Sequence, residues 1–301
     1  MTEQLDSTNI SDEKTFCGYV AIVGPPNAGK STLMNTILGE RLSIVTPKPH
    51  TTRTRVLGIA SFRPYQVIFL DTPGILTPRY RLQEVMQQQI TASVFDADAV
   101  IALFDYEKRD KHTIEETSEI ASMGAGKTLF ALNKMDLCND DELDLSPYPE
   151  GTIPISALHE INMGILGDAI RDAMPPGPFL YPEDMLAEQP ERLFVAELIR
   201  ETIFEVMRQE IPYTSAVSIE QFVERDPKYY IQANIFVDRN SQKGMMIGGQ
   251  GRTLKNIGSQ ARKKIDAFLD HPVYLELYVK VRPDWMKRDQ DLKDLGYIDG
   301  E

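Results

Sequence analysis

Five short segments of this chain combine residue types that bind phosphate, magnesium and a nucleobase. They occupy residues 24–31, 51–52, 71–74, 133–136 and 156–158. A glycine-rich loop is typical of a phosphate-binding site, and oxygens of hydroxyl and carboxylate groups are typical ligands of Mg²⁺. An Asp shortly after Asn-Lys can form hydrogen bonds with the edge of a purine. In this order the segments predict a site for a guanine nucleotide with its magnesium ion.

The first segment matches Gly-x-x-x-x-Gly-Lys-Ser and stands between an apolar run, 19–23, and a helical pattern, 31–38. In that context the backbone N–H groups of the loop point at phosphates, and Lys30 adds positive charge at the β- and γ-phosphates. The hydroxyl of Ser31 is expected to bind Mg²⁺. The residues that we assign to this loop are Gly24, Pro25, Asn27, Ala28, Gly29, Lys30, Ser31 and Thr32.

Residues around the next apolar run, 66–70, are expected at the γ-phosphate. Asp71 ends that run, where its carboxylate can hold Mg²⁺ through water, and Gly74 can donate its N–H to the γ-phosphate. In the preceding loop Thr52 is the preferred second hydroxyl ligand; Thr51 is the alternative, although Thr pairs also occur at strand edges. The predicted metal ligands are therefore Ser31, Thr52 and Asp71, and the γ-phosphate segment is Asp71, Thr72, Pro73 and Gly74.

The last two segments predict which base is bound. Two donors of guanine, N1–H and the exocyclic amine, can both bind the carboxylate of Asp136, whereas adenine lacks this pair and would leave Asp136 unpaired. Ala157 is expected to offer its backbone N–H to guanine O6, and Lys134 to pack along the ring. GTP is favoured over ATP for this reason. The base-binding residues are Asn133, Lys134, Asp136, Ser156, Ala157 and Leu158.

Hydrolysis is assigned to Lys30, Thr52, Asp71 and Asn27. The residue after Asp-Thr-Pro-Gly is Ile75, where many small GTPases have a glutamine that orients the attacking water. Isoleucine cannot do this, so we expect slow intrinsic turnover. Asn27 is a candidate ligand for a monovalent cation such as K⁺, whose charge would act as an arginine finger does.

The apolar runs that precede these segments indicate an α/β fold. Four short, almost continuous apolar runs are separated by helical patterns, which predicts a mostly parallel sheet with helices on both faces. Ligands of such sheets gather at the carboxyl ends of the strands, and most of the segments above follow such an end. The runs are 19–23, 66–70, 99–104 and 128–132.

A dense group of prolines predicts where this domain ends. Prolines 175, 176, 178, 182 and 190 exclude a helix or a central strand. We therefore expect a disordered leader over 1–15, the α/β domain over 16–174, a Pro-rich linker over 175–192, a second domain over 193–288 and an acidic tail over 289–301. The second domain is expected to be α+β, with helices at 193–209 and 252–269, alternating strands near 217–223 and 231–237, a helical turn at 244–247 and a strand at 273–281.

A Gly-x-x-Gly loop in the second domain predicts RNA binding. It lies at a helix start, and this order of elements matches a KH domain, which clamps single-stranded nucleotides at such a loop. Residues 241–288 hold ten Lys and Arg against four Asp and Glu, a charge of +6 in a chain of −13, so the remainder carries −19. The residues assigned to RNA are Lys243, Ile247, Gly248, Gly249, Gln250, Gly251, Arg252 and Lys255. Ile247 and Ile257 are either a floor for bases or core.

Composition sets the remaining limits. A chain of 301 residues should hold two domains, and it contains no run of 18 apolar residues that could span a membrane. The polar, acidic start lacks the apolar stretch of a signal peptide, and the two cysteines, Cys17 and Cys138, form no metal-type cluster. We expect buried thiols and a cytoplasmic protein; the sequence does not define an oligomeric state, and a monomer is favoured.

Over residues 18–285 the chain resembles the Era family of bacterial GTPases with a C-terminal KH domain. The resemblance is carried by residues 24–32, 49–53, 71–74, 133–136, 247–248, 257–258 and 275–277. It implies a P-loop GTPase domain followed by a type II KH domain, a role in small-subunit ribosome maturation at the 3′ end region of the small-subunit rRNA, and loose association with the inner membrane surface. His50 stands where the family often has glutamine.

Two other functions remain as alternatives. The first is an RNA chaperone or scaffold in which the nucleotide is structural, and the second is a GTPase of tRNA modification. The second would need a catalytic partner domain that the order of elements does not provide. RNA affinity measured with a GTP analogue and with GDP separates a switch from a scaffold.

Overall fold

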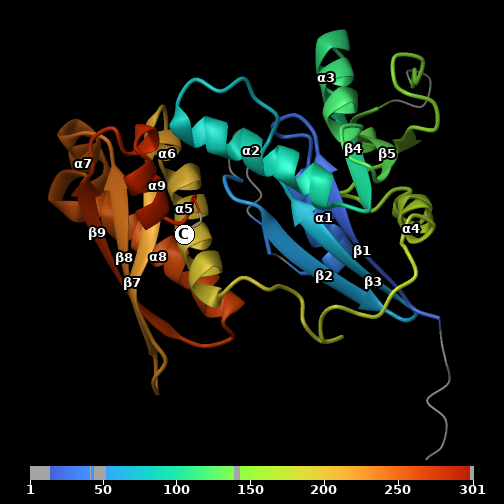
Figure 1. The fold of residues 1–301 in the computed structure, drawn as a ribbon. Coiled ribbons are helices and arrows are strands. Elements are labelled where there is room, and N and C mark those ends of the chain that lie inside the picture. The colour runs from blue at the N-terminus through green and yellow to red at the C-terminus, as the bar shows by residue number, and fades with distance from the viewer. Residues whose placement is uncertain (1–13, 41, 44–51, 139–142, 299–301) are drawn as a thin grey trace, which may run out of the picture.

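The structure is a computed structural model that describes residues 14–40, 42–43, 52–138 and 143–298. Figure 1 shows two domains side by side, each built around its own sheet. The N-terminal sheet has six strands in the order β2-β3-β1-β4-β5-β6, in which only the pairing of β2 with β3 is antiparallel. The strands are β1 Phe16–Val23, β2 Val56–Phe62, β3 Tyr65–Asp71, β4 Ala99–Asp105, β5 Lys127–Asn133 and β6 Ile153–Pro154.

Helices cover both faces of this sheet, as predicted. Apolar side chains of α1 and α4 belong to the core on one face, and those of α2 and α3 to the core on the other. Because both faces are buried, the central strands consist mostly of apolar residues, and all seven residues of β4 are buried. These helices are α1 Lys30–Leu38, α2 Arg81–Asp96, α3 Lys111–Ala121 and α4 Met163–Arg171.

The Pro-rich linker lies against the edge of the sheet. Gln66, fully buried on β3, accepts the backbone N–H groups of Leu180 (2.8 Å) and Tyr181 (3.0 Å) at its Oε1. The N–H of Ile59 on β2 donates to the carbonyl of Leu186 at 2.8 Å. The edge strand β2 thus gains a hydrogen-bonded neighbour in place of an open edge.

The C-terminal domain contains a three-stranded sheet in the order β7-β8-β9, with β7–β8 antiparallel and β8–β9 parallel. Its inner face packs on α5 and α8, and Ile257, Ala261 and Ile265 of α8 are fully buried there. The elements are α5 Glu191–Val206, α6 Ile211–Thr214, β7 Ala216–Val223, β8 Tyr229–Val237, α7 Asn240–Ile247, η3 Gly249–Gly251, α8 Arg252–Phe268, β9 Val273–Val281, η4 Trp285–Lys287 and α9 Asp289–Asp294.

The two domains share a small apolar core at their junction. Trp285 is fully buried there, together with Leu82 of α2 and Leu292 of α9. The ring of Tyr297 stacks on that of Trp285 with centroids 5.8 Å apart. The segment predicted as an acidic tail therefore contains a short helix and packs on both domains.

The structure differs from the sequence predictions in several places. α5 begins at Glu191, inside the predicted linker; the predicted turn at 244–247 is the end of an eight-residue helix; and β2, α6 and α9 were not predicted. Ile257 is core and not a floor for bases, because it is fully buried. The predicted disorder of the leader falls almost wholly on residues 1–13, outside the described ones.

Candidate functional site: a phosphate loop and a base-binding edge

The loop between β1 and α1 is a tight turn with little room for side chains. Gly29 has φ +96°, and a Cβ there would lie 2.2 Å from Nδ2 of Asn133. A Cβ on Gly24 would lie 2.3 Å from the carbonyl oxygen of Leu103 on β4. Asn27, half-buried, also has positive φ, +66°. Gly24 and Gly29 are therefore required by the path of the backbone, which leads into the N-terminus of α1.

Lys30 is folded into this loop. Its side chain is 6% exposed, and Nζ donates to the carbonyls of Gly24 and Pro25 at 3.0 Å each. Burial lowers the pKa of Lys30 to about 8, although the nearby carboxylate of Asp71 acts in the opposite direction. The amine is thus held against backbone oxygens at the start of α1, where an incoming phosphate would be a stronger partner.

Three oxygen-bearing side chains meet next to Lys30. Ser31 Oγ donates to Asp71 Oδ2 at 2.7 Å and lies 3.1 Å from Oγ1 of Thr52. Asp71 is fully buried, and its other oxygen, Oδ1, has no hydrogen bond of normal geometry among the described residues, although the Ser43 hydroxyl is close enough to lower the pKa of Asp71. Burial raises the pKa of Asp71, against the lowering effect of the Ser31 hydrogen bond and the Lys30 charge.

A buried carboxylate whose second oxygen lacks a normal hydrogen bond to the described residues, beside two hydroxyls, fits a small divalent cation with oxygen ligands such as Mg²⁺. These are the three residues predicted as metal ligands. The alternative ligand, Thr51, and the divergent His50 lie outside the described residues.

The segment after Asp71 is packed against the phosphate loop. Thr72 donates its hydroxyl to the carbonyl of Ile22 at 2.7 Å, which fixes the segment on β1. A Cβ on Gly74 would lie 2.8 Å from Cα of Pro26. Ile75 donates its N–H to the carbonyl of Gly24 at 3.1 Å, and its side chain is only 8% exposed. Ile75 is thus a packing residue.

Asn133 joins the base-binding edge to the phosphate loop. Its Nδ2 donates to the carbonyl of Ala28 at 2.8 Å, and its Oδ1 accepts the N–H of Ala157 at 2.9 Å. The predicted donor to guanine O6, Ala157 N–H, therefore has an acceptor within the protein in this structure. The side chain of Asn133 is 3% exposed, so both bonds are shielded from water.

Asp136, the predicted guanine reader, is oriented by its neighbours. Its Oδ1 accepts the hydroxyl of Ser156 at 2.5 Å, and Nε2 of His159 lies 3.8 Å from its Oδ2. Lys134 has positive φ, +71°, and its Nζ donates to Asp105 (2.9 Å) and Glu107 (2.8 Å). The Leu158 side chain is 70% exposed and does not belong to the core of the domain.

Sequence reasoning missed Asp105, Glu107 and Lys108. The first two hold Lys134, and Lys108 donates to the carbonyl of Pro26 in the phosphate loop at 2.7 Å. The signal available for Asp105 is its position: it ends a buried apolar strand, as Asp71 does. The loops after β4 and β5 thus support each other.

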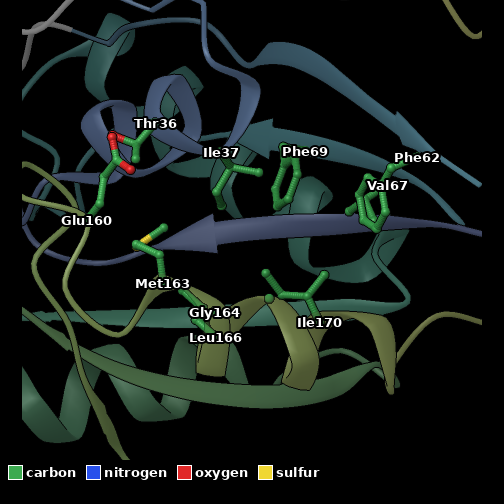
Figure 2. Close-up of a pocket in the computed structure, with 11 residues that line it drawn as sticks. Thr36, Ile37, Phe62, Val67, Phe69, Glu160, Met163, Gly164, Leu166 and Ile170 are labelled. Carbon is green, nitrogen blue, oxygen red and sulfur yellow. The ribbon is translucent and has the colours of Figure 1, made fainter.

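An apolar cavity of about 300 Å³ lies behind this edge, between α1, β3 and α4. In Figure 2 Phe62, Val67 and Phe69 line one end, while Thr36 and Glu160 lie together at the other. The hydroxyl of Thr36 is already bonded to the carbonyl of Ala157, at 2.8 Å. Because its lining is almost wholly apolar, this cavity does not suit phosphate or a base.

The Gly-x-x-Gly loop connects α7 to α8 on the side of the C-terminal domain away from α1 (Figure 1). Gly248 has φ +72°, and a Cβ there would lie 2.1 Å from Oγ1 of Thr253. Gly251 has φ +73° and open space around it. Ile247 is half-buried beside the loop. Position 248 therefore accepts only glycine. The loop leads directly into the long helix α8.

The basic side chains of residues 241–288 include both paired and unpaired ones. Lys264 is paired with Glu201 and Glu205, Arg282 with Asp291 and Asp294, Lys287 with Asp284, and Arg288 with Asp291. By contrast, Lys243, Arg252 and Lys255 form no ion pair with any described residue. Some of the positive charge counted in the +6 of residues 241–288 is therefore neutralised by acidic residues outside that segment. Within the described part of the chain, the charges of Lys243, Arg252 and Lys255 are not neutralised in this way.

Comparison with known proteins identifies the family. A family model described as "50S ribosome-binding GTPase" matches residues 19–134, and one described as "KH domain" matches residues 210–286. GTPase Era of Geotalea daltonii is 38% identical over 297 residues, covering 96% of this chain and all of the relative. The chain belongs to the Era family of GTPases. GTPase Era of Trichlorobacter lovleyi is 41% identical over 300 residues, with 96% and 100% of the two chains covered.

Solved Era structures match both domains together. A variant of Aquifex aeolicus Era bound to GDP.AlF₄⁻ superposes with a TM-score of 0.86 at 36% identity, over 94% of this chain and 99% of that one. Era in complex with MgGDPNP and nucleotides 1506–1542 of 16S ribosomal RNA gives 0.88, with the same identity and coverage. The predicted family, fold and GTPase activity are confirmed. No described helix is long and apolar enough to cross a membrane.

Proposed function

We propose that this GTPase is a switch that binds the 3′ end region of small-subunit rRNA and assists maturation of the small ribosomal subunit. The observation that supports it is the similarity, along both domains, to an Era structure that holds a GTP analogue and this part of 16S rRNA. GTP binding by the first domain would control RNA binding by the second. For the two domains we propose the sequence-based limits 16–174 and 193–288, with the second extended to Glu191 at the start of α5 and to Asp294 at the end of α9.

For the nucleotide, this proposal uses the residues predicted from the sequence. Lys30 binds the phosphates, Asp136 binds guanine, and Ser31, Thr52 and Asp71 hold Mg²⁺. Bound there, the ion would neutralise charge on the β- and γ-phosphates during transfer to water. Because Ile75 is a buried packing residue, no glutamine orients the water from this position, and the intrinsic rate is expected to be slow.

A potassium ion at Asn27 is a further part of the proposal. Asn27 lies in the phosphate loop, next to the expected position of the phosphates, and has a positive φ. GTP turnover in K⁺ should exceed turnover in Na⁺ at equal ionic strength, and the Asn27→Ala variant should lose the difference. Equal rates in the two salts would exclude a role for K⁺.

The test of the switch is RNA affinity in two nucleotide states. An RNA with the 3′ end sequence of 16S rRNA is titrated with protein that carries a non-hydrolysable GTP analogue or GDP. A switch gives tighter binding in one state, whereas a scaffold gives identical affinities. The tRNA-modification alternative has no observation in its favour.

The test of the RNA site is a triple substitution to Ala of Lys243, Arg252 and Lys255. It should weaken binding and reduce the slope of log affinity against log salt by about 2, since each lost phosphate contact removes ~0.7 for a single strand. The matched control replaces the exposed Lys111, Lys127 and Arg208, and should leave the slope unchanged. An unchanged slope in the first triple variant would exclude the proposed RNA site.

We also propose a cytoplasmic location with peripheral contact at the inner membrane surface, which rests on the family resemblance alone. Cell fractionation tests it: protein found only in the soluble fraction at low ionic strength would argue against the membrane contact.

A further inference from the structure

Arg53 is a buried cation that reaches from the nucleotide site into the C-terminal domain. Its side chain is 4% exposed. Nη1 donates to the carbonyl of Ser215 and Nη2 to that of Tyr213, both at 2.7 Å. Nη1 also lies 3.3 Å from the hydroxyl of Tyr297, and the guanidinium stands 5.7 Å from the ring centre of Trp285.

These partners all belong to the C-terminal domain. The two short bonds go to carbonyls at and just after the end of α6, where helix carbonyls lack partners of their own. Within the described ranges no carboxylate pairs with Arg53, so backbone oxygens and one hydroxyl compensate its charge. A planar guanidinium can serve several such acceptors at once, which a lysine cannot.

The residue before Arg53 is Thr52, whose hydroxyl lies 3.1 Å from that of Ser31 in the oxygen cluster with Asp71. Neighbouring Cα atoms are about 3.8 Å apart, so an anchor at Arg53 restricts where Thr52 can lie. On the other side the chain enters β2 at Val56, which is paired with Asp71 itself. Arg53 thus lies between Thr52 and the start of β2, so the residue next to Thr52 is attached to the other domain and the strand that follows is paired within its own.

We propose that Arg53 is a positioning residue of the GTPase site: it fastens the Thr52 segment to the C-terminal domain and so holds the Thr52 hydroxyl against Ser31. The C-terminal domain, through the end of α6 and Tyr297, then forms part of the support of the magnesium and γ-phosphate site. The coupling is reciprocal, because a ligand that holds Thr52 in place also holds Arg53 against its acceptors. This inference extends the proposed GTP-dependent switch, and it rests on the assignment of Thr52 as a ligand of Mg²⁺.

The test compares the affinities of a fluorescent GTP analogue and of GDP, with and without Mg²⁺. Only the triphosphate needs Thr52, so Arg53→Ala should reduce affinity for the analogue by about 5- to 150-fold, the usual range of coupling between sites, and leave GDP affinity unchanged. Arg53→Lys should recover part of the loss. The matched control is Arg55→Ala, two residues along, which removes a surface pair with Asp96 inside the N-terminal domain and should change neither affinity.

A double-mutant cycle shows whether Arg53 acts through Thr52. In a Thr52→Ala background, Arg53→Ala should have little further effect on the ratio of the two affinities. A full additional loss in that background would overturn the proposal. So would an unchanged ratio in a folded Arg53→Ala protein whose melting temperature alone has fallen, because that is the result of a purely structural residue.

If Arg53→Ala does not fold, the same ratio and the same cycle are measured with Arg53→Lys, for which an unchanged ratio also overturns the proposal. Whether the proposed nucleotide-dependent switch fails is decided by a separate measurement, that of RNA affinity. If RNA affinity of the unsubstituted protein is the same with the analogue and with GDP, the proposed function is wrong, while the nucleotide ratios still decide the role of Arg53.

Discussion

Replacing Asn133 with Ala tests whether the base-binding edge and the phosphate loop act as one unit. The amide of Asn133 is the bridge between them: it accepts the N–H of Ala157 and donates to the carbonyl of Ala28. Both partners are fully or almost fully buried, and so is the amide itself. The substitution deletes both bonds and leaves two backbone groups without their partner.

The expected cost follows from those two groups. A buried donor or acceptor without a partner costs about 1–3 kcal/mol, and a water molecule in the vacated space would recover part of that. Roughly 2–4 kcal/mol then separates the arrangement of the two loops that binds nucleotide from a relaxed one. At about 1.4 kcal/mol per factor of ten, GDP affinity should fall roughly 30- to 1,000-fold.

The assay is titration of the folded protein with fluorescent GDP, with melting temperature as a check on the fold. Asn133→Asp is a second variant: it keeps an acceptor for Ala157 but sets a carboxylate oxygen against the carbonyl of Ala28, so it should bind no better than Asn133→Ala. The control is Asn162→Gly, which removes one exposed hydrogen bond from the side-chain amide to the carbonyl of Pro154. Glycine tolerates the positive φ of that position. If the GDP affinity of Asn133→Ala stays within about threefold of that of the unsubstituted protein, the binding free energy has changed by less than about 1 kcal/mol. That result would refute the role of Asn133 as a bridge between the two loops.

Three further predictions concern the base, the RNA loop and the domain junction. Asp136→Asn should shift preference from GTP to xanthosine triphosphate, because an amide can donate to the C2 carbonyl of xanthine; competition binding with both nucleotides measures this, and retained GTP preference would contradict the assignment. Gly248→Ala should abolish most RNA affinity without changing GDP affinity, since its Cβ would meet Thr253 at 2.1 Å, whereas Gly244→Ala in open space on α7 should bind RNA normally. Trp285→Ala should cost about 3–5 kcal/mol and lower the melting temperature of the C-terminal domain, seen by calorimetry; an unchanged transition would show that the junction contributes nothing.

The clustering of the candidate nucleotide-site residues was predictable because each of their motifs is local. The loop 24–31 follows β1, Asp71 ends β3, and residues 133–136 begin at the last residue of β5. Parallel strands bring their carboxyl ends to one edge. β2 was missed because it is an edge strand, paired antiparallel with β3 and interrupted by Gly58. Its support comes from the linker backbone at Leu186, which no pattern in the sequence of β2 reveals.

The role of Arg53 was unpredictable for a related reason. In the sequence it stands beside a threonine pair and looks like one more charged residue of a polar loop. Its partners are more than 150 positions away, and two of them are backbone carbonyls, which carry no signal in a residue pattern. Only the packing of the two domains makes it a buried cation.

A second connection between the same two sites runs through α2. The segment 71–74, predicted to contact the γ-phosphate through Gly74, leads into α2, which begins at Arg81. The buried side chains of its first turns, Leu82, Val85 and Met86, pack in the junction core with Trp285.

Both segments expected to meet the γ-phosphate therefore run directly into contacts with the C-terminal domain, one through Arg53 and the other through α2. Loss of the γ-phosphate would release both segments together, and the junction would lose two of its supports at once. Because the contacts are parallel, removing Arg53 alone should weaken the dependence of RNA affinity on nucleotide without abolishing it, and Arg53→Ala combined with Trp285→Ala should remove what remains.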